Sequence, residues 1–387
     1  MRKKLKIVFY TDTYSPAIDG VVNSIKQSRR ELERRGHKVY IFTAGTAETA
    51  AFEKSDSGLT VLRGIRLRRY PQYTIALKPV FSTKLKDLHP DIIHSHTPFN
   101  MGILAVHAKK LTGARLVSTF HTLVFSDELL AAFLSRNRII KALGKFALMR
   151  YLKWFYQKSD VVIAPSVYIR DMLKSKLGLK GRIDVIPEGV EFMTTENNLS
   201  KSSARKKIGI HTDGKILLYL GRVSPEKNLA LLLKYGKQLE DSGFTIIIAG
   251  DGPYMSECIA LSKKYGLKTI RFPGFIKEDM KRYYYAAADV FCNPSLFDTQ
   301  SLVDLEAMSH SLPILVPKSS AQTDFLSKGK CGEAFNGVNG DDLVKNALKI
   351  ANSPRAYHTR RVAEKYDIKH TVDKLLQTYY SLIESRH

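Results

Sequence analysis

A strand, a helix and a second strand are encoded by residues 6–43, KIVFYTDTYSPAIDGVVNSIKQSRRELERRGHKVYIFT. The stretch begins and ends with short apolar runs of the kind that lie inside a parallel sheet. Between the runs, apolar residues recur at helical spacing from Val21 to Leu32, and Gly36 ends the helix. This order predicts a β-α-β unit, in which a helix connects two parallel strands.

The same alternation continues along the chain. Further apolar runs of strand length lie at 91–94, 116–119, 161–164, 184–186, 215–220, 245–249, 269–272, 290–293 and 313–316. No internal repeat accompanies them, which argues against solenoids and propellers. The pattern predicts an α/β protein with two Rossmann-like, doubly wound domains that face one cleft.

A polar segment separates the two predicted domains. Residues 194–207 contain one large apolar residue and no periodicity, so we interpret them as a linker. The N-terminal domain is then 1–193 and the C-terminal domain 208–370. No strand follows the last helical pattern, at 371–387, and we expect this helix to cross back to the N-terminal domain.

Cysteine spacing and hydropathy narrow the class of protein. The three cysteines among 387 residues, Cys258, Cys292 and Cys331, form no closely spaced pair. This spacing argues against structural zinc and disulfides and favours a reducing compartment. No run approaches the length of a membrane span, and the N-terminal apolar run is too short for a signal peptide. We therefore expect a cytoplasmic protein.

A large positive charge points to anionic partners. The 61 basic and 37 acidic residues give a net charge of +24. Residues 1–190 hold 33 basic and 15 acidic side chains, a surplus of 18, so most of the charge belongs to the first half. A field of this size attracts phosphorylated substrates, anionic membranes or nucleic acid.

Residues 129–159 concentrate this charge, with aromatic residues that include Trp154 and no acidic side chain. The cations are Arg136, Arg138, Lys141, Lys145, Arg150, Lys153 and Lys158. Basic amphipathic helices with aromatic residues bind anionic membrane surfaces, and we predict such contact here, with a second basic tract at 63–86. The alternative is a domain helix whose apolar side is core. We expect no nucleic acid, because no nucleic-acid-binding motif accompanies the charge.

Two cations follow the predicted strand at 215–220. Arg222 and Lys227 lie in the turn GRVSPEK, at the carboxyl end of the strand, where open α/β sheets bind ligands. A guanidinium offers a bidentate fork and an ammonium a point charge. The pair therefore suits a diphosphate.

Two carboxylates, Asp298 and Glu306, lie eight residues apart around the start of a helix near Ser301. The unpaired N–H groups of Leu302 and Val303 and the positive end of the helix dipole would suit a phosphate. The alternative is that Asp298 only caps the helix and that Glu306 lies on a solvated face.

Glycines mark two other turns into helices. Gly250 and Gly252 half match the dinucleotide pattern GxGxxG, but the sixth position is Met255, so we do not expect an NAD site. A tight turn explains both glycines. Gly20 begins the first helix, where a phosphate could approach the backbone without meeting a Cβ; a plain loop-to-helix glycine is the alternative.

Histidines follow two predicted strands of the N-terminal domain. His121 comes after the strand at 116–119, where it is either a site residue or a buried structural histidine. His94 and His96 are two residues apart, with no nearby cysteine or second clear carboxylate. We therefore predict no metal site.

Taken in order, these segments resemble a retaining glycosyltransferase of the GT-B fold, family 4, over nearly the whole chain. The motifs that carry the resemblance lie at 11–14, 20–22, 36–39, 183–190, 221–228, 250–253 and 298–308. Two segments, 90–99 and 118–123, are most similar to bacterial diacylglycerol glucosyltransferases. The resemblance implies transfer of a hexose, in the first instance glucose, from a UDP-sugar to a membrane lipid such as 1,2-diacylglycerol. It also implies an enzyme without metal or cofactor, peripheral on the inner face of the cell membrane.

The resemblance implies a role for each candidate residue. Arg222 and Lys227 would hold the donor diphosphate, and Glu306 the ribose hydroxyls. Asp298 would hold the transferred sugar, with His121 beside it; these two and the two cations form the expected catalytic set. The donor-binding set further includes Gly20, near the β-phosphate, and Gly250, Gly252, Ser301, Leu302 and Val303. The acceptor and membrane set comprises His96, Arg136, Arg138, Lys141, Lys145, Arg150, Lys153 and Trp154.

Three positions depart from the family pattern. Asp298 stands for the usual Glu, Ser301 for a frequent Gly, and Glu188 for a common Asn. The shorter carboxylate at 298 bears on the choice of donor sugar. Two alternatives stay open: a family 4 transferase acting on a polysaccharide or small molecule, and a non-catalytic nucleic-acid-binding protein with the same fold.

Overall fold

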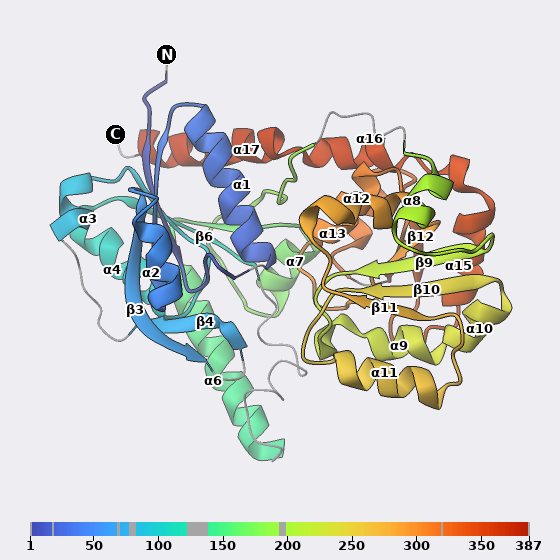
Figure 1. Ribbon diagram of the computed structural model, residues 1–387. Coiled ribbons are helices and arrows are strands. Elements are labelled where there is room, and N and C mark those ends of the chain that lie inside the picture. The colour runs from blue at the N-terminus through green and yellow to red at the C-terminus, as the bar shows by residue number, and fades with distance from the viewer. Residues whose placement is uncertain are drawn as a thin grey trace. The chain divides into compact units, whose positions relative to one another are not determined.

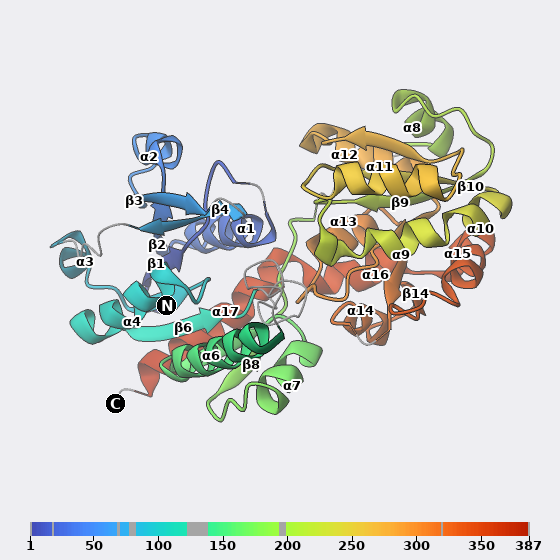
Figure 2. The ribbon, with the colours of Figure 1, turned by 90° about the horizontal axis from the view of Figure 1, so that it is seen from below.

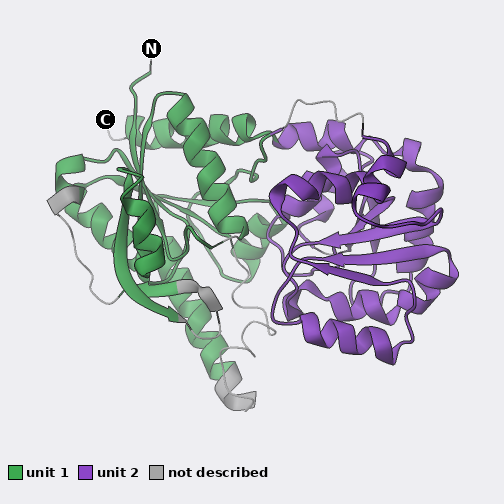
Figure 3. Cartoon of the chain, in the orientation of Figure 1, with its two compact units in different colours: residues 1–191, 367–387 green, residues 192–366 purple. Residues whose placement is uncertain are grey.

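The chain folds into two compact units. The computed structural model describes residues 2–17, 19–67, 70–76, 83–121, 138–192, 199–318 and 320–385. Unit 1 comprises residues 1–191 and 367–387, and unit 2 comprises residues 192–366 (Figure 3). Each unit is one sheet with helices on both faces (Figures 1 and 2). This confirms the doubly wound α/β class in each unit.

The sheet of unit 1 has the strand order β4-β3-β2-β1-β5-β6-β7-β8. Neighbours are parallel except β3 and β4, which form an antiparallel hairpin at the edge. The strands are β1 (Lys6–Thr11), β2 (Lys38–Gly45), β3 (Leu59–Leu67), β4 (Tyr70–Ala76), β5 (Ile92–Ser95), β6 (Arg115–Thr119), β7 (Val161–Ala164) and β8 (Ile183–Val185). The helices are α1 (Gly20–Arg34), α2 (Ala47–Glu53), α3 (Thr83–Leu88), α4 (Asn100–Thr112), α6 (Arg138–Gln157), α7 (Val167–Ser175) and α17 (Ile368–Glu384).

The core of unit 1 lies between β1 and the helices that cover it. Ile7 and Phe9 of β1 are fully buried, in one cluster with the apolar face of α1. Asp19 caps the first turn of α1 and so fixes where the helix begins. The last helix, α17, packs against α1 and adds Val372 and Tyr379 to the same cluster. The two ends of the chain therefore share one core.

The sheet of unit 2 is parallel throughout, with the order β11-β10-β9-β12-β13-β14. The strands are β9 (Lys215–Leu220), β10 (Phe244–Ala249), β11 (Arg271–Gly274), β12 (Val290–Cys292), β13 (Ile314–Pro317) and β14 (Gly332–Phe335). The helices are α8 (Lys201–Lys207), η1 (Pro225–Lys227), α9 (Leu229–Lys234), α10 (Gly236–Asp241), α11 (Met255–Lys264), α12 (Glu278–Ala287), α13 (Leu302–Ser309), α14 (Thr323–Ser327), α15 (Leu343–Asn352), η2 (Pro354–Ala356), α16 (Thr359–Ala363) and η3 (Glu364–Tyr366). This order reverses between β9 and β12, and Rossmann-like sheets bind ligands at such a switch point.

Four parts of the chain differ from the sequence-based expectations. The linker predicted at 194–207 is wrong for its second half, because 201–207 form α8. Ser200 caps this helix, and Arg205 holds it to Asp289 by an ion pair of 2.9 Å. The last helix begins at Ile368, and residues 367–370, predicted for the second domain, belong to unit 1. The hairpin β3–β4 and the short β14 were not predicted.

Candidate active site

The loop after β9 brings two cations to the carboxyl edge of the unit 2 sheet. The hydroxyl of Tyr219 donates to the carbonyl of Arg222 at 2.6 Å, which fixes the turn that carries this guanidinium. The guanidinium of Arg222 has no ion-pair partner among the described residues. Lys227 ends the helical turn η1 that follows.

Lys227 and Asp298 meet across the switch point. Lys227 Nζ lies 2.6 Å from Asp298 Oδ1, and both side chains are largely buried. Burial disfavours the charged amine, but the Asp298 carboxylate outweighs it and raises the pKa of Lys227. Asn293 Nδ2 donates to the other Asp298 oxygen at 3.1 Å. Asp298 is therefore oriented by two donors and is not the cap of α13.

The N-terminus of α13 offers hydrogen-bond donors at the same edge. Ser301 caps the helix, with its hydroxyl accepting from Asp304 N at 3.3 Å. The N–H groups of Leu302 and Val303 donate to no described residue. Together with the helix dipole, they form an arrangement that binds phosphate oxygens well.

Glu306 is held in place from α12. The hydroxyl of Tyr285 donates to Glu306 Oε2 at 2.9 Å, and Lys281 Nζ lies 3.4 Å from the same oxygen. No described residue donates to Oε1. Glu306 is thus a positioned, partly buried carboxylate with one oxygen available to a ligand, and the solvated-face alternative does not apply.

The two glycines after β10 make room for the Arg222 turn. A Cβ at Gly250 would lie 1.8 Å from the Gly221 carbonyl oxygen, and one at Gly252 would lie 2.2 Å from that of Val223. Any side chain would displace this backbone. The glycines therefore position the Arg222 turn; their direct contact with a donor stays a prediction.

At the carboxyl edge of the unit 1 sheet, histidines stack behind one another. His121 Nδ1 lies 2.6 Å from Glu188 Oε1, and its Nε2 lies 3.0 Å from His96 Nδ1. The ring of His96 stacks on that of His94, whose nitrogens contact Thr119 and Tyr379. Burial lowers the pKa of His94 to about 3 and places that of His96 well below its usual value, so both rings are neutral.

Two residues of unit 1, His96 and Gly20, were predicted to contact substrates, and they lie in different environments. The side chain of His96 is buried and stacks on that of His121, which is buried as well; contact of His96 with the acceptor stays a prediction. Gly20 is exposed, and no described atom lies within 4 Å of the position its Cβ would take. Packing therefore does not explain the glycine, which leaves room for a ligand.

Helix α6 is divided between core and surface. Leu152 and Phe155 are buried, whereas Leu143 and Phe146 are each 63% exposed and Trp154 is 43% exposed. The guanidinium of Arg150 lies over the ring of Phe146, and in Figure 1 the helix projects from the body of unit 1. Arg136 lies outside the described residues, as do the side chains of Arg138 and Lys141. Among the described side chains of α6, the core-helix alternative holds only for those in the C-terminal half.

Two family models together cover nearly all of the chain. Residues 18–192 match Glycosyltransferase Family 4, and residues 200–370 match Glycosyl transferases group 1. The chain belongs to glycosyltransferase family 4.

Two relatives of this family 4 glycosyltransferase are named Alpha-monoglucosyldiacylglycerol synthase. The protein of Streptococcus pneumoniae is 29% identical over 368 residues, 92% of this chain and 80% of the relative. The protein of Acholeplasma laidlawii is 28% identical over 378 residues, 92% of this chain and 90% of the relative.

Solved structures show the fold of the transferase. Sucrose-phosphate synthase of Thermosynechococcus elongatus gives a TM-score of 0.74 at 17% identity, covering 99% of this chain and all of that chain (100%). HepE of Anabaena, in complex with UDP-glucose, gives a TM-score of 0.72 at 17% identity and covers 97% of this chain and 100% of that chain. The glycosyltransferase therefore has the GT-B fold.

Within unit 2 of the transferase, the structure brings the predicted donor residues to one sheet edge. Asn293, Tyr285 and Lys281 orient the predicted carboxylates and were missed, because nothing in their local sequence signals these contacts. Only one feature of the sequence marked Glu188 as a candidate site residue: it replaces the Asn that the family usually has at this position.

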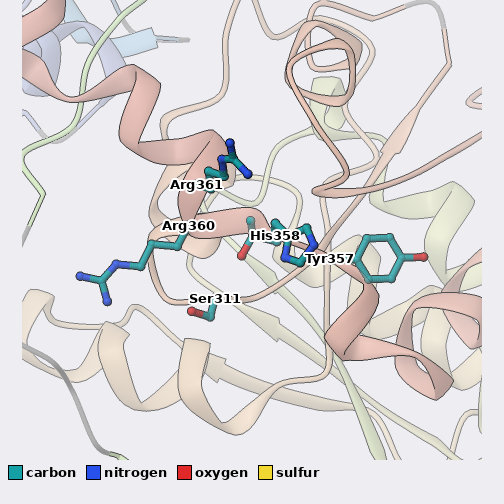
Figure 4. A pocket seen from close by; sticks show the side chains of 6 residues that line it. Ser311, Tyr357, His358, Arg360 and Arg361 are labelled. Carbon is teal, nitrogen blue, oxygen red and sulfur yellow. The ribbon is translucent and has the colours of Figure 1, made fainter.

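Other features of the transferase lie apart from this edge. A pocket of unit 2 is lined by Ser311, Tyr357, His358, Thr359, Arg360 and Arg361 (Figure 4). Ser311 precedes β13, so the pocket belongs to the amino edge of the sheet, and the side chains of Arg360 and Tyr357 point in opposite directions.

The described residues contain no group of three or more potential metal ligands. None of the described helices combines the length and apolarity that a membrane span requires.

Proposed function

We propose that this glycosyltransferase moves a hexose, in the first instance glucose, from a UDP-sugar to a diacylglycerol-type lipid. The two relatives named above support this pair of substrates, because each is an alpha-monoglucosyldiacylglycerol synthase aligned with nine-tenths of this chain. The reaction takes place on an anionic membrane surface, on the inner face of the cell membrane.

The carboxyl edge of unit 2 supports a nucleoside diphosphate as the leaving group. Arg222 and Lys227 supply two positive charges, and the N–H groups of Leu302 and Val303 add the end of a helix dipole. Such groups stabilise the negative charge that develops on the diphosphate as the glycosidic bond breaks. The acceptor hydroxyl attacks the anomeric carbon from the side on which the diphosphate leaves and gives its proton to a departing phosphate oxygen, so the configuration is retained without a metal or a protein nucleophile.

The two carboxylates serve different parts of the donor. Glu306 Oε1, which accepts from no described residue, receives a hydroxyl of the ribose. Asp298 faces the transferred sugar. When the diphosphate binds Lys227, the Asp298 carboxylate shares its ammonium partner and accepts from a sugar hydroxyl. His121 also serves the sugar, as the family resemblance implies.

One observation carries the membrane part of the proposal. Leu143 and Phe146 are large apolar side chains of α6 that stay mostly exposed, next to the exposed guanidinium of Arg150. Apolar residues gain free energy when they enter the headgroup region of a bilayer, and cations are attracted to anionic lipids. A lipid acceptor stays in the bilayer, so the enzyme has to come to it.

A donor and acceptor panel tests the proposal. The protein is incubated with UDP-glucose, UDP-galactose and GDP-mannose, each with vesicles of phosphatidylglycerol and diacylglycerol, and product lipids are identified by mass spectrometry. We expect a monoglucosyl lipid from UDP-glucose. Transfer to a water-soluble glycan at the same rate without vesicles would favour the second candidate, a polysaccharide-directed transferase. No UDP binding by calorimetry would contradict both.

A further inference from the structure

A buried carboxylic acid lies beneath the Lys227–Asp298 pair, and the chemistry proposed above does not use it. Asp304, in the first turn of α13, has a fully buried side chain. Its Oδ1 accepts from Asn293 Nδ2 at 3.3 Å, and no described residue donates to its Oδ2. A buried carboxylate with one oxygen unpaired would carry a large desolvation cost.

The amide of Asn293 joins this acid to the site. The same Nδ2 lies 3.1 Å from Asp298 Oδ2 and 3.0 Å from Ser301 Oγ. An amide nitrogen has only two hydrogens, so three acceptors compete for them. The charge on Asp304 therefore decides how firmly Asn293 holds Asp298.

Gln322 carries a second buried oxygen without a donor. Its Nε2 donates to the Asn293 carbonyl at 3.4 Å, and its Oε1 accepts from no described residue. The Gln322 side chain also acts on Asp304 as a hydrogen-bond donor, which lowers the pKa of the acid, but burial outweighs this effect. A proton on Asp304 removes the buried negative charge that its unpaired Oδ2 would otherwise share.

We infer that Asp304 is a positioning residue that works in its neutral, protonated form and, through Asn293, keeps Asp298 aligned with Lys227. This inference rests on the proposed function only in giving that pair a role with the donor. Loss of the proton would place a second anion beside Asp298 and draw the Asn293 hydrogens away from it.

The groups that face Asp304 agree with a neutral acid. Lys227 is the cation that faces it among the described residues, and this ammonium is already paired with Asp298. The other titratable groups that face it are neutral near pH 7: Tyr219, Tyr285, Cys292 and Cys331. Burial, reinforced by the Asp298 charge, raises the pKa of Asp304 to about 7.

The raised pKa of Asp304 determines whether stability and activity rise or fall with pH. The folded protein keeps a proton on Asp304 that the unfolded chain releases near pH 4. Stability therefore declines as the pH rises from about 4 to about 7, and this contribution is constant above that range. If only the protonated form is active, activity falls about fivefold between pH 7 and 8, following the protonated fraction.

Asp304→Asn tests the inference, because asparagine has the shape of the neutral acid and cannot ionise. We expect activity near that of the wild type at pH 6.5, no fivefold alkaline fall, and a melting temperature that declines less between pH 5 and pH 8. The matched control is Asp279→Asn, at an exposed position of α12. It should keep both wild-type pH profiles.

Two outcomes would overturn the inference. The first is a pH profile of activity and melting temperature in Asp304→Asn parallel to that of the wild type. The second needs no variant: carbon-13 NMR of wild-type protein labelled at aspartate carboxyls, with no resonance titrating near pH 7. The NMR and melting experiments need no substrate, so they test the protonation state of Asp304 even if the protein does not transfer a sugar to lipid.

Discussion

Glu188 accepts a hydrogen bond from His121, with Oε1 2.6 Å from Nδ1 and both side chains at least nine-tenths buried. A carboxylate can only accept, so Nδ1 of His121 carries the hydrogen. In the neutral ring, Nε2 then accepts from His96 Nδ1, and His96 Nε2 is left with a lone pair, buried and without a partner. Glu188 thus sets the tautomers of His121 and His96.

Glu188→Gln should lower kcat by about 10- to 100-fold, because a charge-assisted hydrogen bond contributes about 1.5–3 kcal/mol. Calorimetric UDP affinity should be unchanged, since the two cations expected to hold the diphosphate, Arg222 and Lys227, belong to unit 2. Glu191→Gln, three residues away and exposed, is the control. Equal kcat in both variants would show that the orientation of His121 does not matter for transfer.

Lys227→Ala and Glu306→Ala should each remove most turnover and leave the fold intact. Each removes a charged partner of the donor, and the loss is larger where charge develops in the transition state. Circular dichroism checks the fold, and initial rates of sugar transfer check the effect. Lys264→Ala, an exposed lysine of α11, should behave as the wild type. Undiminished activity in either site variant would remove that residue from the site.

Asp298→Glu should keep activity and change the preference among donor sugars, because the added methylene moves the carboxylate by about one C–C bond. Asp298→Asn should be much worse, since it leaves the largely buried Lys227 without its counter-charge. Rates with UDP-glucose and UDP-galactose measure both effects. If asparagine is tolerated as well as glutamate, the charge at 298 has no part in the reaction.

The buried parallel strands are the part of the fold that sequence reasoning predicts best. β1, β7 and β9 read as continuous apolar runs, because helices cover both faces of a doubly wound sheet. The edge hairpin lacks this signal, since β3 carries Arg63 and Arg66 among its apolar residues. β14 is only four residues long and contains Gly332 and Glu333. Short and edge strands depend on their neighbours for stability, which a local pattern does not report.

The candidate site also combines residues that could be predicted from the sequence with residues that could not. Arg222, Lys227 and Glu306 could be predicted because each follows a strand end or a helix start that the sequence marks. Their partners could not, because contacts such as His121–Glu188 join residues 67 positions apart. The alternative that Asp298 caps α13 failed for a local reason: Ser301 stands next to the helix and takes the cap.

Chelation should leave the reaction unaffected. The described residues contain no group of three or more His, Cys, Asp or Glu side chains that could hold a metal ion, and we propose that cationic side chains and backbone N–H groups neutralise the diphosphate. Initial rates are measured after exhaustive dialysis against EDTA. Activity that disappears on dialysis and returns only with added magnesium or manganese would contradict this prediction.

Anionic vesicles should bind the protein, neutral vesicles should bind it weakly, and high salt should release it. Each basic residue near an anionic surface contributes roughly 1 kcal/mol, and the attraction fades over about 8 Å at physiological salt. Several cations of α6 acting together therefore suffice for binding, and Leu143, Phe146 and Trp154 add interfacial burial. Cosedimentation with phosphatidylglycerol vesicles measures the bound fraction.

Charge reversal at Lys141, Lys145 and Lys153 should reduce both vesicle binding and lipid glycosylation and leave UDP affinity unchanged, because these residues belong to unit 1. The matched control reverses three exposed lysines of unit 2, Lys263, Lys264 and Lys268, and so makes the same change in net charge. If both triple variants lose binding equally, the net charge of the protein attracts it to the membrane and α6 has no special part. If the α6 variant loses UDP binding as well, the helix supports the fold and is not a docking surface.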